Sequence, residues 1–289
     1  MRELTLAANG LRFRCIADGP DDGPLVLLLH GFPEGAASWS AQLPALAAAG
    51  HLAVAPDLRG YGGTDCPEGD DAYRMLHLVA DTAGLIDALG RERCHLAGHD
   101  WGALVGWAVA SAHPDRLLTW SALSVGHPDA FTGAIRDDPD QHERSSYIDL
   151  FRAPGGKAER VLAEDGYRRL RRMYAYGPNP DAVPQPQVDE FVRSMARPGR
   201  LTAGLAYYRA NLGEEAERDR PMAPDPITTP SQLIWGELDP AVGAATTRAT
   251  ERCVEGEYRL CGVSGAGHWL QFERPDEVSR LLLEWIGQH

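Results

Sequence analysis

The stretch best suited to chemistry is the motif GHDWG (98–102), which lies between a short apolar run and an apolar helical segment. An aspartate held between two glycines, where a strand turns sharply into a helix, is presented as a nucleophile. Asp100 has an alternative interpretation, because Asp is also a favoured residue for capping the start of a helix. The two flanking glycines favour the interpretation of Asp100 as a nucleophile.

Other reactive residues also follow apolar runs. Asp239 comes after SQLIWG and His268 comes after YRLCGVSG. Alone, Asp239 before Pro240 resembles any turn aspartate, and His268 resembles a packed loop histidine. Ligands of open α/β sheets, however, bind beyond the carboxyl ends of the strands. Nucleophile, acid and histidine in this chain order match one known type of catalytic triad.

The elements that would position these residues alternate along the chain. Asn9-Gly10 is a strong hairpin signal between two N-terminal strands. Continuous apolar runs are typical of strands buried on both faces. Strands are expected at 25–31, 51–60, 94–100, 117–125, 227–239 and 258–265, and helices at 38–49, 73–89, 101–113, 241–254 and 275–288. This alternation predicts an α/β fold with a doubly wound, mostly parallel sheet.

The alternation stops between about residues 128 and 224, where the chain is polar, rich in arginine and helical in character. The simplest account is an α/β core formed by residues 1–128 and 225–289. Residues 129–224 would then form a helical cap inserted between two strands of the core.

Composition narrows the function classes. The chain has 289 residues and a net charge of −13, which argues against nucleic acid and anionic membrane surfaces as partners. Its five cysteines lack C-x-x-C spacing, and its first residues lack the pattern of a secretion signal. We therefore expect a cytoplasmic protein with reduced thiols. Its oligomeric state, monomer or homodimer, stays open.

Metal and cofactor sites are not indicated. His95 and His99 are four residues apart, but on a predicted strand and turn this spacing does not bring them to one face. The segment Gly60-Tyr61-Gly62-Gly63 lacks the third glycine of a dinucleotide-binding fingerprint. We expect no cofactor and no metal.

Five motifs together carry a resemblance over nearly the whole chain: HGFPE (30–34), DLRGYGGTD (57–65), GHDWG (98–102), WGELDP (235–240) and GHWLQFERPDEV (267–278). They resemble the epoxide hydrolases of the α/β-hydrolase fold. Relatives in that fold with a serine nucleophile carry G-x-S-x-G, whereas here a carboxylate takes the central position. The resemblance implies a small apolar epoxide and water as reactants. It also implies a cis bond before Pro33, with His30 and Gly31 shaping the site.

A carboxylate nucleophile suits attack on a saturated carbon, because the product is an alkyl ester that water can hydrolyse. Asp100 would form that ester, and His268, oriented by Asp239, would activate the water. The backbone N–H groups of Phe32 and Trp101 would form the oxyanion hole for the second step.

Epoxides and haloalkanes both suit this chemistry, and the cap must discriminate between them. An epoxide oxygen needs an acid, for which a tyrosine hydroxyl is suitable. The segments SSYIDLFRAPGG and AYYRANL resemble cap motifs of epoxide hydrolases and point to Tyr147 and Tyr208 as the acids. Haloalkane dehalogenation remains the alternative, since Trp101 could bind a halide. A non-catalytic member of the fold is a more remote one.

Overall fold

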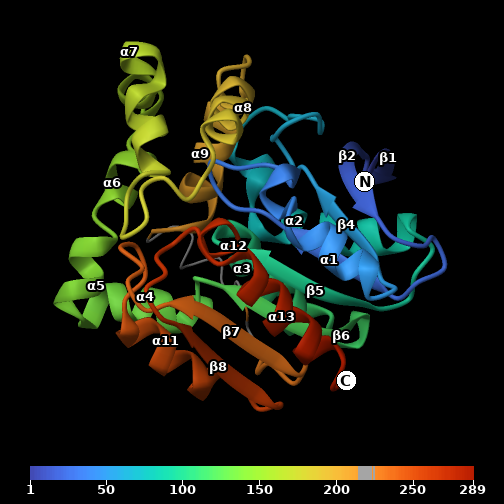
Figure 1. Ribbon diagram of the computed structural model, residues 1–289. Coiled ribbons are helices and arrows are strands. Elements are labelled where there is room, and N and C mark those ends of the chain that lie inside the picture. The colour runs from blue at the N-terminus through green and yellow to red at the C-terminus, as the bar shows by residue number, and fades with distance from the viewer. Residues whose placement is uncertain (214–222, 224) are drawn as a thin grey trace.

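The structure is a computed structural model, and it describes residues 1–213, 223 and 225–289. A central sheet has the strand order β1-β2-β4-β3-β5-β6-β7-β8 (Figure 1). The strands are β1 (Arg2–Ala8), β2 (Leu11–Asp18), β3 (Leu25–Leu29), β4 (Leu52–Pro56), β5 (Cys94–His99), β6 (Leu117–Leu123), β7 (Ser231–Gly236) and β8 (Tyr258–Val263). From β4 to β8 all neighbouring strands are parallel, which confirms the predicted fold class.

The N-terminal hairpin forms the antiparallel edge of this sheet. Strand β1 pairs with β2, and β2 pairs antiparallel with β4. Asn9 and Gly10 have φ values of 45° and 75°, as a two-residue turn with positive φ at both positions requires. The hairpin prediction is therefore confirmed.

Helices cover both faces of the sheet because its central strands are apolar on both faces. In β3, Leu25, Leu27 and Leu29 pack on the side of α2 and α3, whereas Val26 and Leu28 pack on the side of α1 and α13. These two layers of helix are visible on either side of the sheet in Figure 1. The helices of this part are α1 (Gln42–Ala48), α2 (Met75–Ala88), α3 (Trp101–Ala112), α11 (Ala244–Thr250), α12 (Leu270–Glu273) and α13 (Pro275–Ile286).

Among the described residues between β6 and β7 there are six helices: α4 (Pro128–Asp137), α5 (Pro139–Arg144), α6 (Tyr147–Arg152), α7 (Lys157–Met173), α8 (Gln185–Met195) and α9 (Arg200–Asn211). They lie within the segment 129–224 predicted to be a cap, apart from the first residue of α4. The predicted end at residue 224 lies outside the described residues. Helix α7, at the upper left of Figure 1, is interrupted at Glu164–Tyr167, where Asp165, Gly166 and Tyr167 have positive φ.

Some helices are shorter than their sequence pattern predicts. The segment 38–49 divides into a 3₁₀ turn, Ala36–Trp39, and helix α1, which begins only at Gln42. Pro44 explains the late start, because proline is tolerated in the first turn of a helix and not in its interior. Similarly, α2 begins at Met75 after a 3₁₀ turn at Asp70–Tyr73.

The five cysteines are free thiols. Within the described ranges, none of the helices combines the length and apolarity that crossing a bilayer requires.

Candidate active site

Asp100 occupies a sharp turn between β5 and α3, as the sequence predicts. Its backbone has φ 51° and ψ −115°, a conformation that is strained for any residue with a side chain. The flanking glycines, Gly98 and Gly102, allow the turn to pack closely against neighbouring backbone. A Cβ at Gly98 would lie 2.3 Å from the carbonyl oxygen of Gly102, and one at Gly102 would lie 2.2 Å from that of Leu29.

The loop after β3 faces the carboxylate of Asp100. The backbone N–H of Phe32 donates to Oδ1 of Asp100 at 2.8 Å, and the backbone of Trp101 also hydrogen-bonds this carboxylate. The Phe32–Pro33 bond is cis, as the resemblance implies. His30 fixes the loop: its Nε2 accepts from the N–H of Leu58 at 2.9 Å, so its Nδ1–H donates to the Gly31 carbonyl at 2.8 Å.

His268 and Asp239 complete the group of residues predicted from the strand ends. Nδ1 of His268 lies 3.0 Å from Oδ2 of Asp239, and Nε2 lies 3.8 Å from Oδ2 of Asp100. The other oxygen of Asp239 accepts from the backbone N–H groups of Ala241 and Val242 at 2.7 and 3.0 Å. These bonds hold the Asp239 carboxylate, which in turn fixes the orientation of the imidazole.

Burial and charge set the protonation of this group. Burial lowers the pKa of His268, but the charge and hydrogen bond of Asp239 and the charge of Asp100 outweigh it and raise this pKa to about 9. For Asp100, burial raises the pKa above its usual value, although His268, His99 and the backbone donors counteract this effect. At neutral pH His268 is therefore an imidazolium beside the carboxylates.

A second buried hydrogen-bond network, formed by Glu34, His99 and Gln271, contacts the backbone of His268. The sequence analysis did not assign these residues to the site. The carboxylate of Glu34 accepts from the Gly31 N–H at 3.0 Å and from Gln271 at 2.8 Å, and it lies 2.9 Å from Nδ1 of His99. Nε2 of His99 lies 2.9 Å from the backbone carbonyl of His268. Nδ1 of His99 therefore faces Glu34, and Nε2 faces the loop of His268. Glu34 and His99 thereby connect the loop of His268 to the loop of Gly31 and Phe32.

Tyr147 and Tyr208 lie in the same cavity as Asp100 and His268. Their ring centroids are 6.4 Å apart, and the ring of Phe151 packs against both, at 5.2 and 5.0 Å. Burial and the charge of Asp100 raise the pKa of both hydroxyls, which keeps them protonated and able to donate. Tyr208 also accepts a hydrogen bond from the side chain of Trp101.

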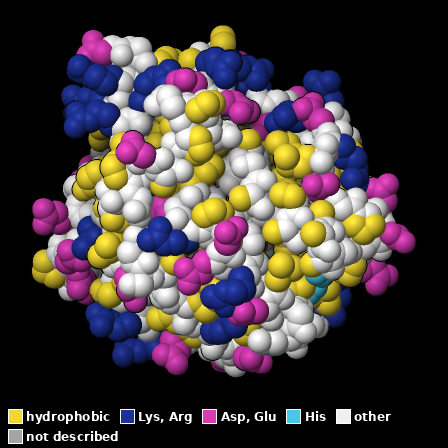
Figure 2. All heavy atoms as spheres, viewed as in Figure 1, with side chains coloured by type: hydrophobic (Ala, Val, Ile, Leu, Met, Phe, Trp, Pro, Cys, Tyr) yellow, Lys and Arg dark blue, Asp and Glu magenta, His cyan; other side chains and the backbone are white. Residues whose placement is uncertain are grey.

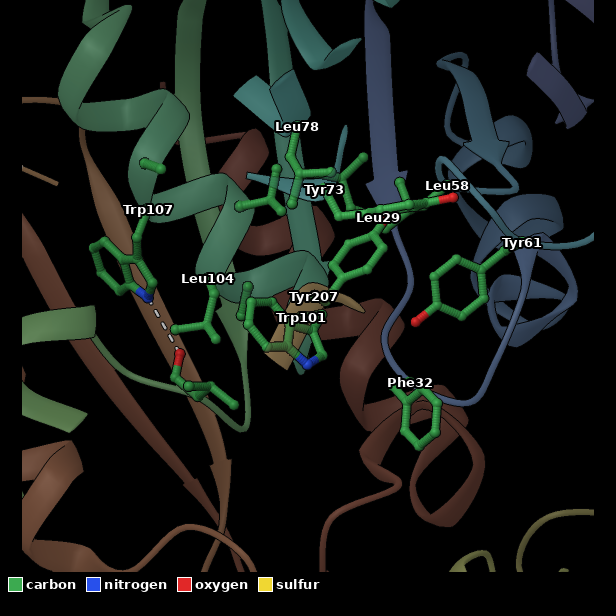
Figure 3. Packing of buried hydrophobic residues seen from close by; sticks show 14 of the residues in the cluster. Leu29, Phe32, Leu58, Tyr61, Tyr73, Leu78, Trp101, Leu104, Trp107 and Tyr207 are labelled. Carbon is green, nitrogen blue, oxygen red and sulfur yellow. Dashed lines mark hydrogen bonds between the residues drawn. The ribbon is translucent and has the colours of Figure 1, made fainter. Parts of the chain in front are cut away.

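The floor of the site is a packed aromatic layer. The rings of Trp101 and Tyr207 are 5.5 Å apart, and the hydroxyl of Tyr207 donates to the carbonyl of Arg59 at 2.9 Å. Figure 3 shows Trp101 and Tyr207 beside each other, with Leu104 and Trp107 continuing along α3. Buried packing of this kind limits the side-chain motion of Phe32 and Trp101, whose N–H groups face the carboxylate.

Comparisons with known proteins agree with this fold. Residues 24–275 match the model of the α/β hydrolase fold family. Epoxide hydrolase A of Mycobacterium tuberculosis is 38% identical, with 98% of this chain and 97% of the relative covered. Epoxide hydrolase 4 of Mus musculus is 32% identical, with 97% of this chain and 77% of the relative covered. The crystal structure of epoxide hydrolase A from Mycobacterium thermoresistibile is 35% identical, with a TM-score of 0.86 over 99% of this chain and 98% of that one.

The parallel sheet and the sharp turn at Asp100 define a hydrolase of the α/β fold. Within that fold, the chain belongs to the epoxide hydrolase family.

Proposed function

We propose that the protein hydrolyses epoxides to vicinal diols in two steps, through a covalent ester on Asp100. The observation that carries this proposal is the unequal environment of the two carboxylate oxygens. Oδ1 of Asp100 accepts from the Phe32 N–H at 2.8 Å. Oδ2 lies 3.8 Å from Nε2 of His268, beyond the usual length of a hydrogen bond, so it is the oxygen suited to attack carbon.

In the first step, Oδ2 attacks one carbon of the oxirane ring, a C–O bond forms and the ring C–O bond breaks. The electron pair of the broken bond goes to the epoxide oxygen. Tyr147 and Tyr208 donate hydrogen bonds to that oxygen and supply its proton, because an alkoxide is a poor leaving group. The raised pKa of each hydroxyl means that both tyrosines enter the step protonated.

In the second step, water attacks the carboxyl carbon of Asp100. Once Asp100 is an ester its negative charge is gone, and that charge is one of the causes that raise the pKa of His268. The pKa of His268 therefore falls, and the ring gives up its proton, which restores the tyrosine hydroxyl that protonated the epoxide oxygen. Nε2 then takes a proton from water as the water oxygen bonds to the carboxyl carbon, and the N–H groups of Phe32 and Trp101 stabilise the oxyanion. When this intermediate collapses, the bond between the carboxyl carbon and the diol oxygen breaks, the diol oxygen takes the proton of the new carboxyl group, and Asp100 is a carboxylate again.

Haloalkane dehalogenation, the alternative, requires donors that are free to bind a halide. The side chain of Trp101 hydrogen-bonds Tyr208, and the two rings are 4.9 Å apart. This contact favours epoxides, for which Tyr208 is the useful donor.

A side-by-side assay tests the proposal. Purified protein is mixed with styrene oxide or with 1-bromobutane, and diol and bromide are measured. We expect phenylethanediol and no bromide, and the Asp100→Ala variant should form neither. Bromide release without diol would replace the proposal with dehalogenation, and inertness toward both compounds would favour a non-catalytic role.

A further inference from the structure

The reactive residues lie between two cavities of very different size. Asp100, Tyr147, Tyr208 and His268 line both. One cavity has a volume of about 20 Å³, enough for roughly one water-sized group. The other has about 1090 Å³, slightly above the range of about 300–1,000 Å³ for ligand pockets.

The small cavity is closed by apolar side chains, contributed by Leu104, Val125, Phe131, Ile148, Leu212 and Val242. A hydrogen atom or a methyl group fits there, and a longer alkyl arm does not. One carbon of the oxirane must therefore be nearly unsubstituted, and any long substituent must extend into the large cavity.

Two arginines of α7, Arg169 and Arg172, line the large cavity. They are three residues apart and thus share one face of the helix. Both are exposed, and neither guanidinium forms an ion pair or a hydrogen bond with any residue that the structure describes. The adjacent arginines of α7 do form ion pairs, Arg168 with Asp165 and Arg171 with Asp189.

Acidic groups in the same cavity do not neutralise the two arginines. Asp140 is paired with Arg144 at 2.7 Å, which leaves Glu143 as the other carboxylate of the outer wall. The face is basic although the chain has a net charge of −13. Figure 2 shows Lys and Arg side chains gathered at the upper left, where α7 stands in Figure 1.

We propose that the preferred substrates are terminal epoxides whose one long substituent ends in a carboxylate, and that Arg169 and Arg172 bind this carboxylate. The planar guanidinium suits the bond, since it can donate two parallel hydrogen bonds to a carboxylate. The terminal oxirane carbon then faces the small cavity. This inference rests on the proposed epoxide hydrolysis.

Paired substrates test the inference. The probes are undecanoic acid with a terminal epoxide, its methyl ester, and an isomeric acid with the oxirane at mid-chain. For the wild type, kcat/KM for the terminal acid should exceed that for the ester by about fivefold to tenfold, because two charged hydrogen-bonding pairs are each worth a fraction of the 1.4 kcal/mol that corresponds to tenfold. This preference should shrink as salt is added. The mid-chain isomer should react more slowly than the terminal acid.

Two matched double variants assign the effect to the arginines. Arg169→Ala/Arg172→Ala should bring the acid-to-ester ratio close to one, mainly through KM. Arg160→Ala/Arg168→Ala removes the same charge from exposed positions of α7 that do not line the cavity, and it should keep the wild-type ratio. Equal kcat/KM for acid and ester in the wild type, or equal effects of the two variants, would overturn this inference and leave epoxide hydrolysis intact. A protein that opens none of the three epoxides would overturn both.

Discussion

Nε2 of His268 lies 3.8 Å from Oδ2 of Asp100, beyond the usual length of a hydrogen bond. The imidazole therefore faces the carboxylate without holding Oδ2, the oxygen that we propose attacks the epoxide. The opposite nitrogen is fixed at 3.0 Å from Asp239. This arrangement suits a base that acts on water only after Asp100 has been alkylated.

Replacing the base should separate the two steps. In His268→Gln, Asp100 can still attack the epoxide, but the ester has no base to promote its hydrolysis. Intact-protein mass spectrometry after mixing with styrene oxide should show the added mass of one substrate. The double variant Asp100→Ala/His268→Gln should show no added mass. Turnover at the wild-type rate in His268→Gln would contradict the role of this residue.

The charge of Asp100 should control the pKa of His268. Negative neighbours stabilise the imidazolium, and they raise the pKa of His268 to about 9. Asp100→Asn removes one of these charges with little change of shape, as alkylation would. An NMR titration of the imidazole should therefore give a lower pKa in Asp100→Asn than in the wild type. An unchanged pKa would show that alkylation does not switch His268 into its basic form.

The two tyrosines should act together on the epoxide oxygen. Each single change, Tyr147→Phe or Tyr208→Phe, leaves one hydroxyl and should slow alkylation moderately. The double change should lower the single-turnover rate by about a hundredfold to ten-thousandfold, the usual contribution of a general acid. Tyr176→Phe, farther out in the same cavity, is the control and should react at nearly the wild-type rate. A double variant with near-wild-type alkylation would exclude the tyrosines as acids.

The strained backbone at Asp100 should be measurable as lost stability. Asp100→Gly and Asp100→Ala both remove the carboxylate, but only glycine adopts φ 51° and ψ −115° without a steric penalty. Strain of this kind costs about 1–3 kcal/mol, and the greater freedom of glycine in the unfolded chain offsets up to about 1 kcal/mol of it. Urea denaturation should find the glycine variant more stable by about 1 kcal/mol. If the alanine variant is equally stable, the turn is not strained.

Residues at strand ends were predictable because parallel strands place their carboxyl ends along one edge. Asp100, Asp239 and His268 were found in this way, although 139 positions separate Asp100 from Asp239 in the sequence. Tyr147 and Tyr208 required the resemblance to a family, since nothing in their local pattern distinguishes them from packing tyrosines. The structure brings both to the cavity that Asp100 lines.

The buried hydrogen-bond network next to His268 could not be predicted from the local sequence pattern. Glu34, His99 and Gln271 meet only in the folded chain, and no spacing links them in the sequence. The position of Glu34 directly after HGFP, and of His99 directly before Asp100, was the available signal. For the interruption of α7, the sequence offered only a weak signal, Gly166, because glycine adopts positive φ readily. Asp165 and Tyr167 adopt positive φ only under constraint.

The source of the diol oxygen tests the covalent mechanism most directly. Enzyme in excess over styrene oxide is allowed one turnover in ¹⁸O-labelled water. If Asp100 attacks the epoxide, the new diol oxygen comes from the carboxylate, so the first diol should be mostly unlabelled. The label should appear in the peptide that contains Asp100. Fully labelled diol from that first turnover, with no label in the Asp100 peptide, would contradict the carboxylate nucleophile.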